Sequence, residues 1–385
     1  MNRIVAVTLA GVVAMFGTLG GCKKDSTSGG PSGAGAVKIG VTVPLSGNLQ
    51  SYGKRALDGM RQRVEELNES GGVEGRKIEL VVEDNRGDAN DTRNSFRKLA
   101  QVDKVVAVIG PVTSTNALAI KGDAVNEKLP TLTPTATNDM VTPRSGYVFR
   151  ACFNDSFQGA KVAAYVLSTG AKKAAVMVDK SSDYSKGLSA SFRKAFEAGG
   201  GAVVEEGYQQ KDTEFGPQLA KIKDSGAEIL FVPGYPPEVP MIIQQAKTAG
   251  LDCRLCGADG WDNEEVKKNA GDNLVGCTYM CAFDPNDPRV MVGKFVEGFK
   301  ARYKETPGTF EALGYDSVSM LAEAMKKGAG RQEIRDGLAA LKDFEVVTGR
   351  ITITPDGDAS KEGFILKMVK SDGRLATECV QKVSP

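Results

Sequence analysis

The sequence contains no histidine, and this absence removes several kinds of active site. Without an imidazole the chain has no Ser-His-Asp or Cys-His arrangement and no metal site built on histidine ligands. Histidine is also the commonest general base of enzymes, so its absence argues against catalysis. Ser-Lys chemistry and carboxylate pairs remain available, but we expect a protein that is not an enzyme and that carries no cofactor.

An excess of charge of one sign is also missing. The chain has 49 Lys and Arg residues against 48 Asp and Glu residues, which leaves a formal net charge of +1. This balance gives no electrostatic footprint for nucleic acid, so we expect no nucleic-acid partner. Beyond the N-terminus, no apolar run approaches the ~20 residues that a spanning helix needs. The length of 385 residues predicts about two domains.

The N-terminal segment, by contrast, is apolar and has the features of an export signal. Arg3 supplies a positive charge, residues 4–16 are uncharged, and Gly20 and Gly21 precede Cys22. This order is typical of a secretory signal peptide over residues 1–22. A cysteine directly after two small residues resembles a bacterial lipobox, in which Cys22 becomes the lipidated first residue of the mature protein. The alternative is an ordinary signal peptide with an incidental cysteine.

Six cysteines remain after Cys22, an even number in a protein expected outside the cytosol. An oxidising compartment favours disulfides, so all six are disulfide candidates. Four of them, spaced as Cys-x-x-Cys and Cys-x-x-x-Cys, also resemble the thiolate ligands of a zinc site. Disulfides are the better interpretation and we expect no metal, but the connectivity stays open because strand residues i and i+3 point to opposite faces. The candidates are Cys152, Cys253, Cys256, Cys277, Cys281 and Cys379.

The segment 23–36 is rich in Ser and Gly and predicts a flexible tether. From Val37 onward, short β-rich runs alternate with helical stretches, and this order restarts after Arg150. Such alternation predicts two α/β lobes, each with a parallel sheet flanked by helices. Near the C-terminus, the runs 349–354 and 364–369 flank a turn sequence and predict a β-hairpin.

Six short motifs occur in a fixed order along the chain. Each is weak by itself, but together they resemble the leucine/isoleucine/valine-binding proteins, the extracytoplasmic receptors of branched-chain amino-acid ABC transporters. The resemblance extends from Val37 to the tail. The motifs are Pro44-Leu45-Ser46-Gly47 with Tyr52-Gly53, Gly110-Pro111-Val112-Thr113-Ser114, Thr133-Pro134-Thr135-Ala136-Thr137-Asn138, Asp179 through Tyr184 to Gly187, Gly234-Tyr235-Pro236-Pro237-Glu238, and Gly257-Ala258-Asp259-Gly260-Trp261-Asp262.

The resemblance implies a two-lobed α/β fold of the periplasmic-binding-protein-like type I, with three hinge crossovers and the ligand in the cleft. Open parallel sheets bind ligands at the C-terminal ends of their strands, and domain interfaces favour small-molecule sites. We expect the crossovers near Cys152, Phe283 and Val346. The predicted N-terminal lobe therefore comprises residues 37–152 and 284–345, and the predicted C-terminal lobe comprises residues 153–283 and 346–385.

The residues at the strand ends suit an α-amino acid. Ser114 follows a buried strand at a predicted helix N-terminus, where free N–H groups favour a carboxylate. Thr135 and Thr137 offer a carbonyl and a hydroxyl, and Asp259 offers a counter-ion for an ammonium group. Helix capping and ordinary core packing are the structural alternatives. By the resemblance, the predicted ligand-binding residues are Tyr52, Ser114, Thr135, Ala136, Thr137, Tyr184, Tyr235, Asp259 and Phe310.

The function that the resemblance implies is capture of a small neutral amino acid, branched-chain or otherwise aliphatic. The protein would close by hinge motion and deliver the ligand to ABC permease subunits, as a periplasmic monomer with a lipid anchor in the cell-envelope membrane. Asp259 stands where many branched-chain receptors carry Glu, and we expect Trp261 near the pocket rim. An alternative is a sensor receptor of the same fold for an amide, urea-like or aromatic ligand.

Overall fold

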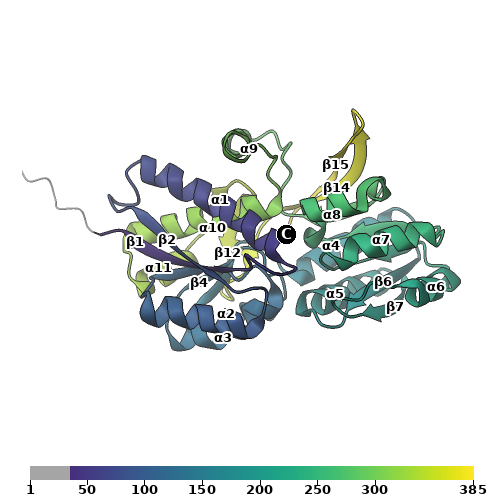
Figure 1. Ribbon diagram of the computed structural model, residues 1–385, viewed down its shortest axis with the longest axis horizontal. Coiled ribbons are helices and arrows are strands. Elements are labelled where there is room, and N and C mark those ends of the chain that lie inside the picture. Colours follow the sequence, from purple (N-terminus) through teal and green to yellow (C-terminus); the bar gives the residue numbers. More distant parts are fainter. Residues whose placement is uncertain (1–34) are drawn as a thin grey trace, which may run out of the picture. The chain divides into compact units, whose positions relative to one another are not determined.

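The computed structural model describes residues 35–385, which are coloured along the sequence in Figure 1. The predicted signal peptide, the predicted lipidation at Cys22 and nearly all of the predicted tether lie outside the described residues. Within residues 35–385, no helix is both long enough and apolar enough to cross a membrane.

The first lobe is built on a five-stranded parallel sheet in the order β2-β1-β3-β4-β5. Strand β1 lies inside this sheet, and six of its seven residues are buried, as expected for a Val- and Ile-rich strand covered on both faces. The strands are β1 (Val37–Val43), β2 (Ile78–Asp84), β3 (Ala107–Ile109), β4 (Thr131–Thr133) and β5 (Val148–Arg150). The intervening helices are α1 (Gln50–Glu69), α2 (Ala89–Arg97) and α3 (Ser114–Asn126).

The second lobe is built on a seven-stranded sheet in the order β15-β14-β10-β9-β8-β6-β7. Its first five strands along the chain are parallel, and the last two join antiparallel at one edge. The strands are β6 (Lys173–Asp179), β7 (Ala202–Tyr208), β8 (Ile229–Phe231), β9 (Arg254–Gly257), β10 (Thr278–Cys281), β14 (Gly363–Ser371) and β15 (Arg374–Val383). The helices are α4 (Asp155–Ser168), α5 (Asp183–Ala198), α6 (Gly216–Ser225), α7 (Glu238–Thr248) and α8 (Glu264–Ala270).

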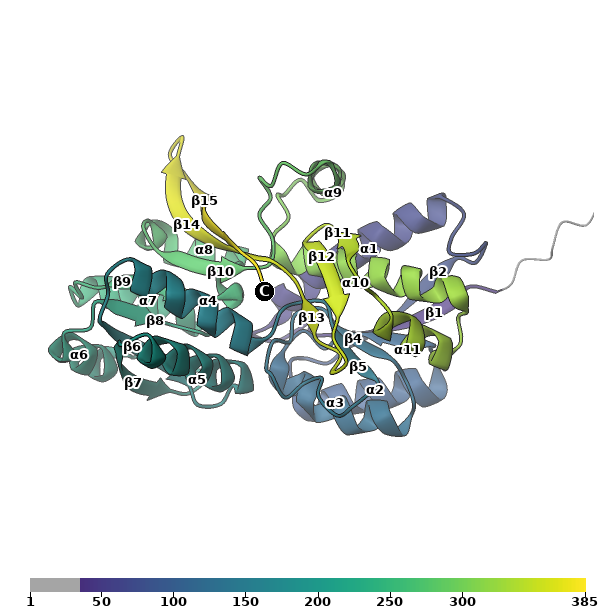
Figure 2. The ribbon, with the colours of Figure 1, turned by 180° about the vertical axis from the view of Figure 1, so that it is seen from behind.

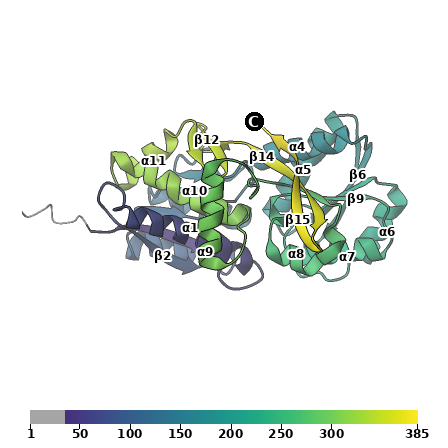
Figure 3. The same cartoon turned by 90° about the horizontal axis from the view of Figure 1, so that it is seen from above.

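After β10 the chain returns to the first lobe. Helix α9 packs on α10 through a cluster of aromatic and aliphatic side chains, and Figure 3 shows the two helices from above. A small antiparallel sheet, ordered β11-β12-β13, then precedes β14. These elements are α9 (Val290–Tyr303), α10 (Thr309–Ala324), α11 (Arg331–Ala339), β11 (Phe344–Val346), β12 (Gly349–Ile353) and β13 (Ala359–Ser360).

The small sheet corrects two expectations about the C-terminal region. The predicted hairpin between 349–354 and 364–369 is wrong, because β12 pairs with β11 and β13, whereas β14 pairs with β15 and β10. The small sheet is hydrogen-bonded to the first lobe, where the Arg150 N–H donates to the Gly357 carbonyl over 3.1 Å. The last crossover therefore lies between β13 and β14 (Figure 2), later in the chain than the boundary expected at Val346.

The other two crossovers lie close to their expected places, between β5 and α4 and between β10 and α9. Helices α1 and α10 pack unusually closely, since a Cβ on Gly59 would lie 1.9 Å from the Glu311 carbonyl oxygen. A Cβ on Gly314 would likewise lie 2.1 Å from the Ala56 carbonyl oxygen. This close approach brings Tyr52, on α1, beside Phe310, on α10.

Candidate ligand-binding site

In the first lobe, the loops after β3 and β4 are joined by hydroxyl groups. The Ser114 hydroxyl accepts a hydrogen bond from the Asn138 N–H over 3.1 Å, and the Thr135 hydroxyl donates to the Val112 carbonyl over 2.6 Å. The N-cap residue of α3, Thr113, makes no side-chain cap hydrogen bond. The first N–H groups of α3 therefore remain available to an anion such as a ligand carboxylate.

In the second lobe, Asp259 follows β9 and is buried. Its Oδ1 accepts hydrogen bonds from the Tyr184 hydroxyl over 2.8 Å and from the Gln158 side-chain amide over 3.0 Å. The Asp259 N–H in turn donates to the Gln158 Oε1 over 2.9 Å. Burial raises the pKa of Asp259 to about 6, although the bonds from Tyr184 and Gln158 oppose this shift. The residue is thus a fixed carboxylate whose charge is poorly solvated and would gain from a cationic partner.

Asp155 connects the two groups of residues. Its N–H donates to the Thr137 carbonyl over 2.8 Å. Both of its carboxylate oxygens, and the Thr137 hydroxyl, are buried without a hydrogen-bond partner among the described residues. Burial raises the pKa of Asp155 well above its usual range, the nearby Thr137 hydroxyl opposes this rise, and the charge of Asp259 adds to it. Unsatisfied polar atoms of this kind are rare inside proteins and mark places where a ligand or water supplies the missing partners.

Four aromatic rings form a row beside these polar groups. The ring centroids of Phe310 and Tyr52 are 4.6 Å apart, those of Tyr52 and Tyr235 are 5.2 Å apart, and those of Tyr235 and Tyr184 are 4.8 Å apart. The row crosses from the first lobe to the second, where the Tyr52 hydroxyl donates to the Gly260 carbonyl over 2.6 Å. An amphipathic ligand would therefore meet polar groups on one side and aromatic rings on the other.

Further hydrogen bonds hold the two lobes together around this site. The Asn138 side-chain amide donates to the Asp183 carbonyl over 2.8 Å, and the Asp183 N–H donates to the Thr115 hydroxyl over 3.1 Å. At the edge, the Ser51 hydroxyl donates to Glu265 over 3.1 Å. The structure thus has the strand ends of both lobes in direct contact.

The structure therefore brings the predicted ligand residues of both lobes to one place, while their role in binding stays a prediction. Two residues of the site, Asp155 and Gln158, were missed by the sequence analysis. Their spacing of three places both on one face of α4, directly after the cap residue Asn154, whose side chain accepts from the Phe157 N–H. A capped helix start followed by Asp and Gln on one face was the signal that could have found them.

The expectation for Trp261 is wrong. The side chain is only 2% exposed, and its indole N–H donates to the Val232 carbonyl over 2.8 Å. The ring packs under Gly257, where an added Cβ would lie 2.1 Å from it. Trp261 therefore belongs to the core of the second lobe and not to the pocket rim, because a buried indole N–H needs an acceptor and finds one in Val232, directly after β8.

The structure also differs from the predicted disulfides, because it keeps all six cysteines of the described residues as free thiols. Cys256 pairs with Thr278 in the β9–β10 register, so the side chains of Cys256 and Cys277 point to opposite faces of the sheet. Burial raises the pKa of the Cys152 and Cys256 thiols to about 12. Within residues 35–385, no group of three or more Cys, Asp or Glu side chains is placed to hold a metal ion.

Two lobes of parallel sheet, with polar and aromatic residues from both meeting at the strand ends, define a solute-binding protein of the type I periplasmic-binding-protein class. The chain belongs to the periplasmic binding protein family, whose model matches residues 36–374. The predicted family and fold class are thereby confirmed.

Relatives with named ligands agree with this assignment. The chain is 29% identical over 338 residues to a leucine-, isoleucine-, valine-, threonine- and alanine-binding protein of Pseudomonas aeruginosa, covering 86% of this chain and 89% of the relative. Its fold is similar to that of a leucine-binding protein from Thermotoga maritima, with a TM-score of 0.86, 30% identity, and coverage of 91% and 99%. A branched-chain amino acid transporter substrate-binding protein from Streptococcus pneumoniae, in complex with isoleucine, gives a TM-score of 0.84, 34% identity, and coverage of 91% and 100%.

Proposed function

We propose that this protein captures a neutral aliphatic amino acid between its lobes and delivers it to ABC permease subunits. The observation that carries the proposal is the buried Asp259 carboxylate, held by Tyr184 and Gln158 opposite the hydroxyl-bearing loops of the first lobe. Supporting it are the relatives named for leucine, isoleucine and valine, together with a structure that holds isoleucine.

Each part of an amino acid has a matching group. The carboxylate would accept hydrogen bonds from the N–H groups at the start of α3 and from the Ser114 hydroxyl. The ammonium group would donate to Asp259 and to the main chain of the loop containing Thr135, Ala136 and Thr137. Asp155 would add a second acceptor on the same side. The aliphatic side chain would then lie against the rings of Tyr52, Tyr235 and Phe310.

Ligand capture would use the hinge. With the three crossovers flexing, the lobes separate and admit the ligand, and closure re-forms the bond from the Tyr52 hydroxyl to the Gly260 carbonyl. The closed form is the one that the permease would recognise. We further propose that the mature protein is a monomer anchored in the envelope membrane through a lipid on Cys22. It would act in binding and not in catalysis.

Calorimetric titration with leucine, isoleucine, valine, threonine and alanine tests this function. Loss of a buried charge partner typically costs about 2–5 kcal/mol, so Asp259→Asn should weaken binding by roughly 30-fold or more. Asp179→Asn is the matched control, because Asp179 is another buried carboxylate at a strand end of the second lobe whose hydrogen bonds stay within its own loop.

The expected result is normal affinity in the control and wild type and weak binding in Asp259→Asn. Equal affinity in all three proteins would remove Asp259 from the site. A wild type that binds none of the five amino acids but does bind an amide, a urea-like molecule or an aromatic acid would keep the fold and overturn the ligand class.

A further inference from the structure

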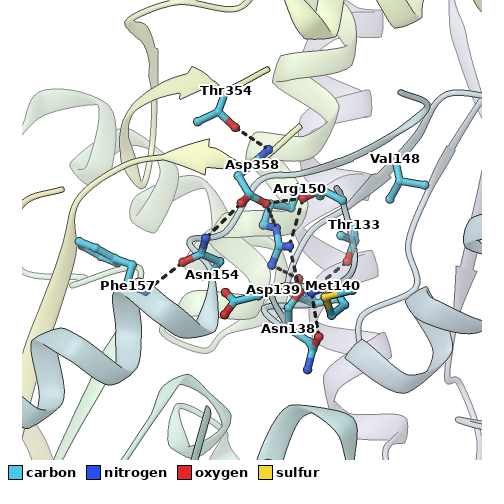
Figure 4. Close-up of polar contacts among 12 residues, drawn as sticks. Thr133, Asn138, Asp139, Met140, Val148, Arg150, Asn154, Phe157, Thr354 and Asp358 are labelled. Carbon is cyan, nitrogen blue, oxygen red and sulfur yellow. Dashed lines mark hydrogen bonds and ion pairs between the residues drawn. The ribbon is translucent and has the colours of Figure 1, made fainter. Parts of the chain in front are cut away.

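Arg150 is the largest charged side chain that the first lobe buries completely. It ends β5, directly before the first crossover, and is 0% exposed. Its guanidinium Nη1 donates to the Ala136 carbonyl over 3.0 Å. Its Nη2 donates to the Asn138 carbonyl over 2.9 Å, and Figure 4 shows Arg150 beside Asn138 and Asp358. The Ala136 carbonyl belongs to the peptide group directly before Thr137, and the Asn138 carbonyl belongs to the peptide group directly after Asn138. The arginine therefore fixes the loop before and after a predicted ligand contact without itself being one.

The positive charge of Arg150 is balanced by a carboxylate of the small antiparallel sheet, that of Asp358. Nε of Arg150 lies 2.7 Å from Oδ1 of Asp358, which is in the turn between β12 and β13. The same carboxylate accepts a hydrogen bond from the Thr142 hydroxyl, and Thr142 Oγ1 is 3.3 Å from Nη2 of the arginine. Because a buried charge without a partner is strongly unfavourable, Asp358 is required to hold Arg150 where it is.

Asp358 also reaches the first crossover. Its Oδ2 accepts from the Asn154 side-chain amide over 3.1 Å, and Asn154 Oδ1 caps α4 by accepting from the Phe157 N–H over 2.9 Å. Helix α4 carries Asp155 and Gln158, the residues that adjoin Thr137 and Asp259. The Asp358 carboxylate, close to the third crossover, is therefore linked through Arg150 to the Thr137 loop of the first lobe. Through Asn154 it is also linked to the start of α4, a helix of the second lobe.

We propose that Arg150 and Asp358 are positioning residues that couple the hinge to the ligand cleft. Through them, the geometry of the crossovers sets the orientation of the Thr137 peptide relative to the start of α4. The inference rests on the proposed function and extends it, because affinity would depend on an ion pair that does not touch the ligand. A planar, forked guanidinium suits this role, since a lysine ammonium cannot reach two carbonyls and a carboxylate in the same fixed geometry.

Arg150→Lys is the main test, and Arg331→Lys is a closely matched control. Arg331 also holds three backbone carbonyls of the first lobe, those of Ala100, Val105 and Glu127, but at the opposite ends of the strands. Three measurements apply to each variant: the thermal unfolding midpoint, the affinity for leucine by calorimetry, and amide hydrogen exchange of the ligand-free protein. The amides to follow are those of Ala136 and Asn138, which are bonded to the Thr133 and Ser114 hydroxyls.

In Arg150→Lys we expect at least tenfold faster exchange at Ala136 and Asn138 and at least tenfold weaker leucine binding. Arg331→Lys should lower the unfolding midpoint while leaving both other quantities at their wild-type values. Asp358→Asn keeps the shape of the side chain and should also speed the exchange and weaken leucine binding, each by a smaller factor. If Arg150→Lys does not fold, Asp358→Asn takes its place as the main test. The double variant should be no worse than the stronger single one, because the two residues act as a pair.

A lower unfolding midpoint with unchanged loop exchange and unchanged affinity in Arg150→Lys would show a purely structural ion pair and overturn the proposal. If the wild type fails to bind leucine, the proposed function is in question, but the exchange measurement on the ligand-free protein still decides the role of Arg150. Faster exchange at the two amides would then support it, and unchanged exchange would overturn it.

Discussion

The two lobes contribute to the cleft in different ways. The first lobe offers main-chain groups and hydroxyls on loops, and these loops are held in place from behind by a buried arginine. The second lobe offers a charged side chain, Asp259, which is held by two neighbouring side chains. Ligand affinity should therefore depend on loop geometry in the first lobe and on the ionised state of Asp259 in the second lobe.

The largest expected effect is that of pH on ligand affinity, because pH changes the charge of Asp259 in the second lobe and leaves the main-chain groups and hydroxyls of the first lobe unchanged. Asp259 attracts an ammonium group only in its ionised form, and its pKa in the ligand-free protein is raised to about 6, so affinity should approach its full value well above pH 6. Below pH 6 it should fall by about tenfold per pH unit. Calorimetry at pH 7.5, 6 and 5 measures this loss, and the remaining weak binding of Asp259→Asn should depend on pH less steeply than that of the wild type.

The stability of the ligand-free protein should increase as the pH falls, whereas its affinity for the ligand decreases. A carboxyl group whose pKa is higher in the folded than in the unfolded state binds more protons when folded, so folding is favoured as pH falls from about 6 toward about 4. Burial raises the pKa of both Asp259 and Asp155. Urea unfolding over this range should show the rise, and a stability that falls together with affinity would contradict the assignment of Asp259 as a poorly solvated acid.

A smaller effect is expected where the lobes meet. Tyr52→Phe keeps the ring in its row but removes the hydroxyl that donates to Gly260 over 2.6 Å. A neutral hydrogen bond contributes about 1 kcal/mol, so affinity should fall about fivefold. Because this bond joins the lobes, the loss should be found mainly in the dissociation rate, which stopped-flow measurements can follow. A change confined to the association rate would argue against a bond that acts in the closed form.

The smallest effect is expected at the edge of the cleft. Ser51→Ala removes the hydrogen bond to Glu265, which also joins the lobes but is partly exposed. Substitutions at such sites usually change free energies by less than about 0.5 kcal/mol, so affinity should change by less than about threefold. Calorimetric titration of Ser51→Ala and Tyr52→Phe under the same conditions checks this prediction. Equal losses of affinity in the two variants would show that burial of the contact is unimportant.

The sequence predicted most of what local pattern controls. The alternation of β-rich runs with helical stretches marks the two α/β lobes, and the strand-end motifs mark residues that meet in the structure. The small sheet was missed because its strands are two to five residues long and pair across turns that no periodicity marks. Gln158 was missed for a related reason, because its partner Asp259 lies 101 positions away in the sequence.

The position of Trp261 also depends on a contact with a residue distant in the sequence, the hydrogen bond to the Val232 carbonyl. The burial of this side chain has a practical consequence. The chain contains one tryptophan, so its tryptophan emission comes from a single indole, two residues beyond Asp259 and within the core of the second lobe. The indole is shielded from solvent and held by its hydrogen bond to Val232. Emission changes on ligand addition would therefore report rearrangement behind Asp259, which makes the unlabelled protein its own optical sensor.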